Sequence, residues 1–141
     1  MIEAHRYHDL SVGHRVVGHE NKCRWLHGHN YRVHFYVAGS LDSVGRVLDF
    51  GVIKARLCQW LEERWDHKLL LWEQDPFLPA LQALGGDVAA SVVVVPFNPT
   101  AENMGAFLLH EVGPVALAGT GIVLRQVVVE ETRKCSARVT L

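Results

Sequence analysis

The chain has 141 residues, a length that suits one domain around a single hydrophobic core. Hydrophobic residues make up 49% of it, charged residues 21%, and the formal net charge is -1. This composition excludes a disordered or fibrous chain, and it lacks the basic footprint that nucleic acid requires. We therefore predict one domain over residues 1–141 with no nucleic-acid partner.

The N-terminal residues MIEAHRYHD carry charges where a signal peptide needs an apolar core. The apolar runs 92–95 and 127–129 are far shorter than the roughly 20 residues of a membrane helix. Three cysteines are too few, and an odd number, for a disulfide framework. These features favour a cytoplasmic protein with no membrane partner and with free, metal-binding or catalytic cysteines.

Two segments alternate between apolar and polar side chains, as half-buried strands do. In the first, 4–16, His14 falls on the same face as Leu10 and Val12. In the second, 30–37, the apolar side chains keep one face, and extending this phase backwards places His27 and His29 on the apolar side. All three imidazoles are therefore expected to point inward.

Asp49 is expected to cap an amphipathic helix, because apolar residues follow it at helical spacing. They are Phe50, Ile53, Leu57, Trp60 and Leu61. The segment 73–99 holds four prolines and the pair Gly85–Gly86, which predicts a loop region with a strand over 88–95.

Thr100 can cap a second helix, with Glu102 in the first turn complementing the helix dipole. Its buried stripe is Met104, Phe107, Leu108 and Val112, and Gly113–Pro114 is expected to end it. Segments 121–132 and 136–141 are predicted strands. The sequence thus predicts an α+β domain in which two helices accompany antiparallel strands.

Three inward histidines suit a catalytic zinc ion, which commonly takes three protein ligands and leaves one position open. His27 and His29 point the same way, and the glycine between them permits close backbone approach. A lone pair of this kind also occurs without metal. His14 in phase, with a cysteine nearby, favours the metal interpretation.

Cys23 has three interpretations. It can be a fourth ligand that closes a structural site of one cysteine and three histidines. It can remain a free thiolate favoured by the nearby cation and by Lys22 and Arg24. It can also be a small buried hydrophobe, which is the account we expect for Cys58 and extend to Cys135.

Two further groups can carry chemistry. Asp66 precedes His67 just past the first helix, where a carboxylate can orient an imidazole for proton transfer. Glu131 is in phase with Val127 and Val129, which places a carboxylate at the end of an inward-facing row. Alternatively, that strand ends at Val129 and Glu131 is one of a solvated pair.

Six motifs, in this order, resemble the 6-pyruvoyl-tetrahydropterin synthase superfamily. They are SVGHR (11–15), CRWLHGHNY (23–31), GRVLDF (45–50), WDHKLL (65–70), PTAEN (99–103) and VVVEET (127–132). Six ordered motifs are far more specific than any one of them. The CxxxHGH spacing resembles the QueD group, the 6-carboxy-tetrahydropterin synthases, whereas the synthases of biopterin formation usually have two more residues between cysteine and HGH.

The resemblance implies a zinc ion bound by His14, His27 and His29, with Cys23 as a general base beside it. It implies that Asp66 and His67 assist proton transfer and that Glu131 anchors the pterin. Within the PTAEN segment, Thr100 and Glu102 are weaker candidates for the substrate pocket.

The resemblance also implies an activity and an assembly. The activity is that of a lyase acting on 7,8-dihydroneopterin triphosphate, with the 6-pyruvoyl synthase reaction as the alternative. The assembly is the tunnelling fold (T-fold), in which two helices pack on one face of an antiparallel sheet. Sheets of several subunits close into a barrel, usually in a homo-hexamer built as a dimer of trimers. The chain departs from the family pattern in a short 15–22 segment and a long 71–98 segment.

Overall fold

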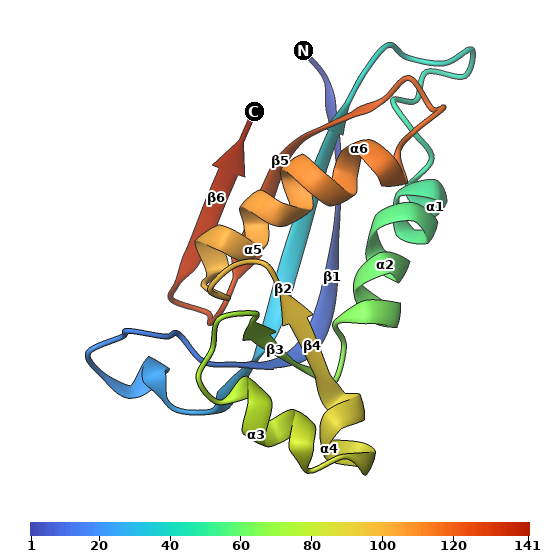
Figure 1. Cartoon of the computed structure of the whole chain (residues 1–141). Helices are drawn as coiled ribbons and strands as arrows, with labels where there is room; N and C mark the ends of the chain where they lie inside the picture. Colours follow the sequence, from blue (N-terminus) through green and yellow to red (C-terminus); the bar gives the residue numbers. More distant parts are fainter.

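Two long antiparallel strands form the centre of the structure. In the computed structural model, which describes residues 1–141, β1 (Glu3–His14) pairs with β2 (His27–Ala38) over its whole length. β5 (Val123–Glu130) and β6 (Ser136–Thr140) extend the sheet antiparallel beyond β2. The resulting sheet has six strands in the order β4-β3-β1-β2-β5-β6 (Figure 1).

The other side of the sheet differs from the prediction of purely antiparallel strands. β3 (Lys68–Trp72) pairs parallel with β1 and with β4 (Val92–Val95), so the sheet is mixed. β3 was not predicted, because five residues directly after a helix carry too little periodicity to distinguish a strand. β4 lies inside the predicted 88–95 strand, and the α+β class is confirmed.

The prolines of segment 73–99 led to a wrong prediction of a loop region. The segment forms the short helices α3 (Leu78–Ala83) and α4 (Gly86–Ser91). Pro79 stands in the first turn of α3, where proline is tolerated because that N–H has no helical partner. Gly85 and Gly86 have φ of 63° and 52°, so this glycine pair makes the left-handed turn between the two helices.

The first predicted amphipathic helix is confirmed. It consists of α1 (Phe50–Ile53), a π-helical stretch (Lys54–Cys58) and α2 (Gln59–Arg64). The Asp49 carboxylate accepts a hydrogen bond from the Gly51 N–H at 2.7 Å, as expected of a cap.

The second amphipathic helix continues past its predicted end. Thr100 caps α5 (Ala101–Phe107) by accepting from the Asn103 N–H at 3.1 Å. A π-helical stretch (Leu108–Val112) then leads into α6 (Gly113–Ala116). Gly113–Pro114 does not end the helix, because the wide π turn comes first and the proline falls in the first turn of α6.

These helices cover one face of the sheet and leave the other face open (Figure 1). The side chains of β1 and β2 alternate as predicted: Val12, Tyr31 and Phe35 are buried under the helices, while Tyr7 and Asp9 are exposed on the opposite face. His14 is 1% exposed, which places it fully on the covered face. None of the helices has the length and apolar character needed to cross a bilayer.

At Gly28 the backbones of the two central strands approach closely. A Cβ at this position would lie 2.8 Å from the Val12 carbonyl oxygen, so Gly28→Ala must push β2 away from β1. We expect it to lower the free energy of unfolding by about 1–3 kcal/mol, measured by urea denaturation.

Gly13→Ala is the matched control, because Gly13 pairs with Gly28 across the two strands. Its Cβ would meet the end of the flexible Leu69 side chain at 3.2 Å, which can shift. A loss as large as that of Gly28→Ala would contradict the assignment of the effect to the Val12 carbonyl.

Candidate metal centre

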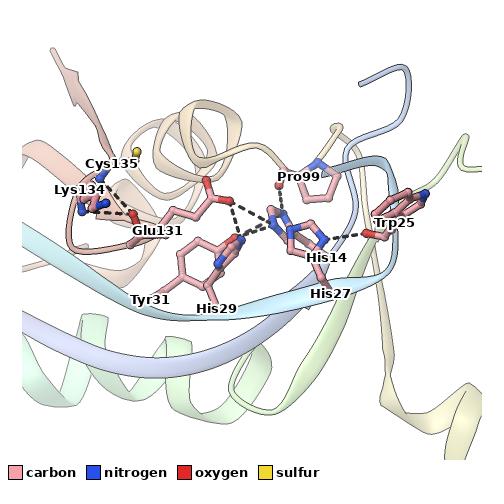
Figure 2. A network of polar contacts seen from close by, with 10 residues as sticks. His14, Trp25, His27, His29, Tyr31, Pro99, Glu131, Lys134 and Cys135 are labelled. Carbon is pink, nitrogen blue, oxygen red and sulfur yellow. Dashed lines mark hydrogen bonds and ion pairs between the residues drawn. The ribbon is translucent and has the colours of Figure 1, made fainter. Parts of the chain in front are cut away.

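Three imidazoles meet at one end of the central strand pair. His14 is the last residue of β1 and pairs directly with His27, the first residue of β2. Their ring centroids lie 4.6 Å apart, and the His29 ring lies 4.9 Å from that of His27 and 5.2 Å from that of His14. The structure therefore brings together the three histidines that the strand phases placed on one face (Figure 2).

Backbone carbonyls fix the orientation of two of these rings. Nδ1 of His14 donates to the Pro99 carbonyl at 2.7 Å, and Nδ1 of His27 donates to the Trp25 carbonyl at 2.6 Å. A carbonyl oxygen only accepts, so each Nδ1 carries a proton, and in the neutral ring the lone pair is then on Nε2. Such partners commonly orient metal-ligating histidines.

Glu131 adds a carboxylate to the cluster. Its Oε1 lies 2.8 Å from Nε2 of His29 and 3.4 Å from Nε2 of His14. The contact with His14 and the charges of the three histidines lower the pKa of Glu131, which burial alone would raise. One ligand atom from each of the four residues lies within 4.8 Å of the others.

The donor set fits a divalent metal. The His29 Nε2 is buried and faces Glu131 outside hydrogen-bond geometry, so it has no hydrogen-bond partner of its own. Burial lowers the pKa of His29, against the raising effect of Glu131, and favours the neutral imidazole that binds metals. Three imidazole nitrogens are a ligand set that a catalytic zinc accepts, with a fourth position left open.

Glu130 and Glu131 are not the solvated pair that the sequence left open. The strand β5 ends at Glu130, whose carboxylate contacts His34 on the open face of the sheet. Glu131, one residue on, turns to the covered side and reaches His14 and His29 (Figure 2). The two carboxylates point to opposite faces of the sheet, as successive side chains of a strand do, although β5 ends at Glu130.

Cys23 is not part of the cluster. It belongs to a single 3-10 turn (Lys22–Arg24) in the connection from β1 to β2, and it is partly buried. Its sulfur is not among the mutually close ligand atoms, so this structure does not form a closed site of one cysteine and three histidines. Of the other thiols, Cys58 is buried as expected, whereas Cys135 is exposed and the core role extended to it is wrong.

Asp66 and His67 lie on the opposite face of the sheet from the cluster of three histidines and Glu131. Asp66 accepts from the Ser11 N–H at 3.0 Å and contacts Nδ1 of His67 at 2.7 Å. Burial raises the pKa of Asp66, but these hydrogen bonds outweigh it and lower the pKa overall. His67 lines a hollow of about 580 Å³ with Ser11, Asn30 and the β2 segment that carries His27 and His29, and Cys23 is not part of its lining.

His67 has an unusual backbone conformation. It is the one non-glycine residue with positive φ, at 58°, and its N–H donates to the Ser11 carbonyl at 2.7 Å. A left-handed conformation typically costs about 1–2 kcal/mol for a residue with a side chain. Such strain is often found at functional sites. The imidazole is held with most of its surface exposed.

The PTAEN segment contributes the start of α5 to the surroundings of Glu131. Glu102 and Glu131 line a common hollow of about 360 Å³, together with Ala101 and Cys135. The Thr100 hydroxyl oxygen accepts the capping hydrogen bond of α5, and its O–H can still donate to a ligand. The substrate-binding roles of Thr100 and Glu102 stay predictions.

A family model described as 6-pyruvoyl tetrahydropterin synthase matches residues 3–141. The chain belongs to the 6-pyruvoyl-tetrahydropterin synthase family. A Rickettsia felis relative named 6-carboxy-5,6,7,8-tetrahydropterin synthase is 34% identical, over 99% of this chain and 100% of the relative. The expectation of a QueD-like member of this family is confirmed.

Solved structures agree with the fold of the family. An uncharacterized protein from Wolinella succinogenes superposes with a TM-score of 0.86 at 25% identity, over 99% of this chain and 97% of that chain. The 6-pyruvoyl tetrahydropterin synthase of Caenorhabditis elegans gives a TM-score of 0.69 at 19% identity, over 99% and 95%. This family fold is the T-fold named in the sequence analysis.

Three parts of the site were not found from the sequence. The carbonyls of Trp25 and Pro99 carry no side-chain signal, so only their positions in the structure reveal them. Tyr31 had a signal, because it continues the alternation of His27 and His29. Its hydroxyl lies 3.2 Å from Nε2 of His14, and burial raises its pKa, so it stays protonated.

The cluster makes a direct prediction about metal binding. In titrations of metal-free protein with Zn²⁺, His14→Ala and His29→Ala should each weaken binding by more than about 100-fold, because even changes around a ligand cost about 10- to 100-fold. His5→Ala is the matched control, since His5 lies on the open face. Equal affinity of His14→Ala and His5→Ala would exclude His14 as a ligand.

Proposed function

We propose that this protein is a zinc-dependent lyase that converts 7,8-dihydroneopterin triphosphate to 6-carboxy-5,6,7,8-tetrahydropterin and releases acetaldehyde and triphosphate. The observation that carries the proposal is the convergence of His14, His27 and His29 with two of their Nδ1 atoms already committed to carbonyls. The CxxxHGH spacing and the names of full-length relatives support the 6-carboxy product. This product belongs to the route to queuosine and other deazapurines.

In this proposal the three histidines hold zinc and the thiol beside them moves the proton. Bound zinc supplies a Lewis acid that acidifies the C–H of the substrate side chain. Cys23 takes that proton as a thiolate, which requires it to be free of the metal. Its place outside the group of close ligand atoms supports this role over that of a fourth ligand.

Glu131 is proposed to hold the pterin ring. A carboxylate can accept two parallel hydrogen bonds from the amino group and ring N–H of the heterocycle. The lowered pKa of Glu131 supports the ionised form that such pairing needs, and the hollow that it shares with Glu102 supports room for a ligand there. Ring anchoring would fix the substrate side chain against the metal and Cys23.

The position of Asp66 and His67 supports an assembled enzyme. The pair lines hollows on the uncovered face of the sheet, and Cys23 of the same chain lines neither of them. In a homo-hexamer built as a dimer of trimers, that face meets other subunits, and we propose that each site takes its proton relay from a neighbouring chain. The hydrogen bonds of Asp66 to Ser11 and His67 would hold the imidazole ready for this use.

Product analysis tests the reaction. The zinc-loaded protein incubated with 7,8-dihydroneopterin triphosphate should release acetaldehyde in equal amount to triphosphate. Cys23→Ala should retain zinc and lose at least about 100-fold in kcat, as expected when a positioned proton acceptor is removed. A 6-pyruvoyl product without acetaldehyde would identify the alternative synthase reaction. Full turnover by Cys23→Ala, with loss of metal and of stability, would show a structural zinc site instead.

Mixed oligomers test the shared site. Cys23→Ala and His67→Ala should each be inactive alone, and their co-expressed mixture should recover roughly a quarter of the parent activity, the chance that random partners unite two intact halves. Two affinity tags isolate the mixed species. The double variant Cys23→Ala/His67→Ala co-expressed with His67→Ala is the control, because no site in it has an intact histidine. No recovery in the first mixture would place both residues in one chain's site.

A further inference from the structure

The connection from β1 to β2 carries Cys23, and the segment 73–99 holds this connection in place. We propose that the ion pair between Arg15 and Asp75 is a positioning device that sets the Cys23 thiol relative to the metal ligands. The inference rests on the proposed function, since it takes Cys23 as the proton acceptor. It gives segment 73–99, with its unpredicted helices, a role in the site.

The pair is built into the interior. Nε of Arg15 donates to Oδ2 of Asp75 at 2.8 Å, with the two side chains 9% and 0% exposed. The guanidinium lies over the Phe77 ring with Cζ 3.8 Å from its centroid. Asp75 is itself fixed, because its other oxygen accepts from the Phe77 N–H at 2.8 Å. The planar Arg15 guanidinium, bonded to Asp75 and stacked on Phe77, therefore has little freedom to rotate.

The same guanidinium also binds the connection from β1 to β2, residues 15–26, which we call the cysteine loop. Nη1 of Arg15 donates to the Arg24 carbonyl at 2.9 Å, and the next residue, Val16, donates its N–H to the Cys23 carbonyl at 2.8 Å. The carbonyls of Cys23 and Arg24 are thus bound by two consecutive residues, Val16 and Arg15. Arg15 directly follows the ligand His14, so these bonds connect thiol and metal site over a very short path.

Asn98 provides a second attachment from the same segment. Its side-chain amide binds both backbone groups of Val17, accepting from the N–H at 3.0 Å and donating to the carbonyl at 2.9 Å. The adjacent Pro99 carbonyl orients His14. Segment 73–99 therefore holds the start of the cysteine loop and one metal ligand together.

Variants that keep the charge separate positioning from folding. Removing one partner of a buried ion pair leaves an uncompensated charge and is strongly destabilising, so a neutral variant would confuse the two effects. Arg15→Lys keeps the cation, but an ammonium on a flexible stem cannot bond Asp75 and the Arg24 carbonyl from one rigid plane. Arg46→Lys is the matched control, since Arg46 also bonds two groups, Asp42 and Asp49, at an exposed turn.

Two readouts test the proposal on zinc-loaded protein. The rate at which iodoacetamide modifies Cys23, followed by mass spectrometry of its peptide, should change at least about 5-fold in Arg15→Lys. With the pterin triphosphate, kcat should fall at least about 10-fold while KM changes less than about 3-fold, since a small misplacement of a reacting group affects the chemical step most. Zinc content should match the parent, and Arg46→Lys should match it in all measurements.

An unchanged Cys23 modification rate in folded Arg15→Lys would overturn the proposal, whatever the activity. Asp75→Glu, which also keeps its charge, repeats the test from the other partner. If both variants fail to fold, the pair is a structural element and the positioning role is wrong. The modification rate requires no turnover, so a parent protein without lyase activity would refute the proposed function separately.

Discussion

The antiparallel pairing of β1 with β2 is the constraint on which the rest of the structure depends. Its register sets His14 opposite His27 and Gly13 opposite Gly28, so the ends of both strands come close enough for three imidazoles to share one small volume. A shift by one residue would turn every side chain of a strand to the other face and disperse the cluster. Glycine fits between His27 and His29 because a Cβ at position 28 would lie 2.8 Å from the Val12 carbonyl oxygen.

The two faces of this sheet have different chemical roles. The face under the helices holds the three clustered histidines, Tyr31 and Glu131, where burial lowers the pKa of His29 and raises the pKa of Tyr31. The open face presents Asp66 and His67, hydrogen-bonded to Ser11 in the same β1 strand that supplies His14. A single strand thus supplies His14 to one group and, three residues earlier, the backbone partner of the other, Ser11.

The connection from β1 to β2, which carries Cys23, is held in place as the rings of His14 and His27 are. A long connection between two strands would ordinarily be mobile. Here polar contacts with a distant segment hold its backbone: the buried pair of Arg15 and Asp75 is joined to the Arg24 carbonyl, and the partly buried Asn98 binds Val17. The buried groups of Arg15 and Asp75 must be paired to be tolerated, which leaves them few alternative positions.

Local pattern alone identified much of this molecule. Alternation in β1 and β2 predicted which face holds His14, His27 and His29, and the caps Asp49 and Thr100 marked the starts of the two amphipathic helices. It failed for β3, whose strand character comes from pairing with β1, and for Pro79 and Pro114, which a first helical turn accommodates. The sequence by itself determined residue phase and helix starts, because these depend on neighbours within a few positions. Only the tertiary structure decided that Glu131 turns toward the histidines, that His67 faces away, and that Asp75 meets Arg15, because each depends on contacts between residues 55 or more positions apart in the chain.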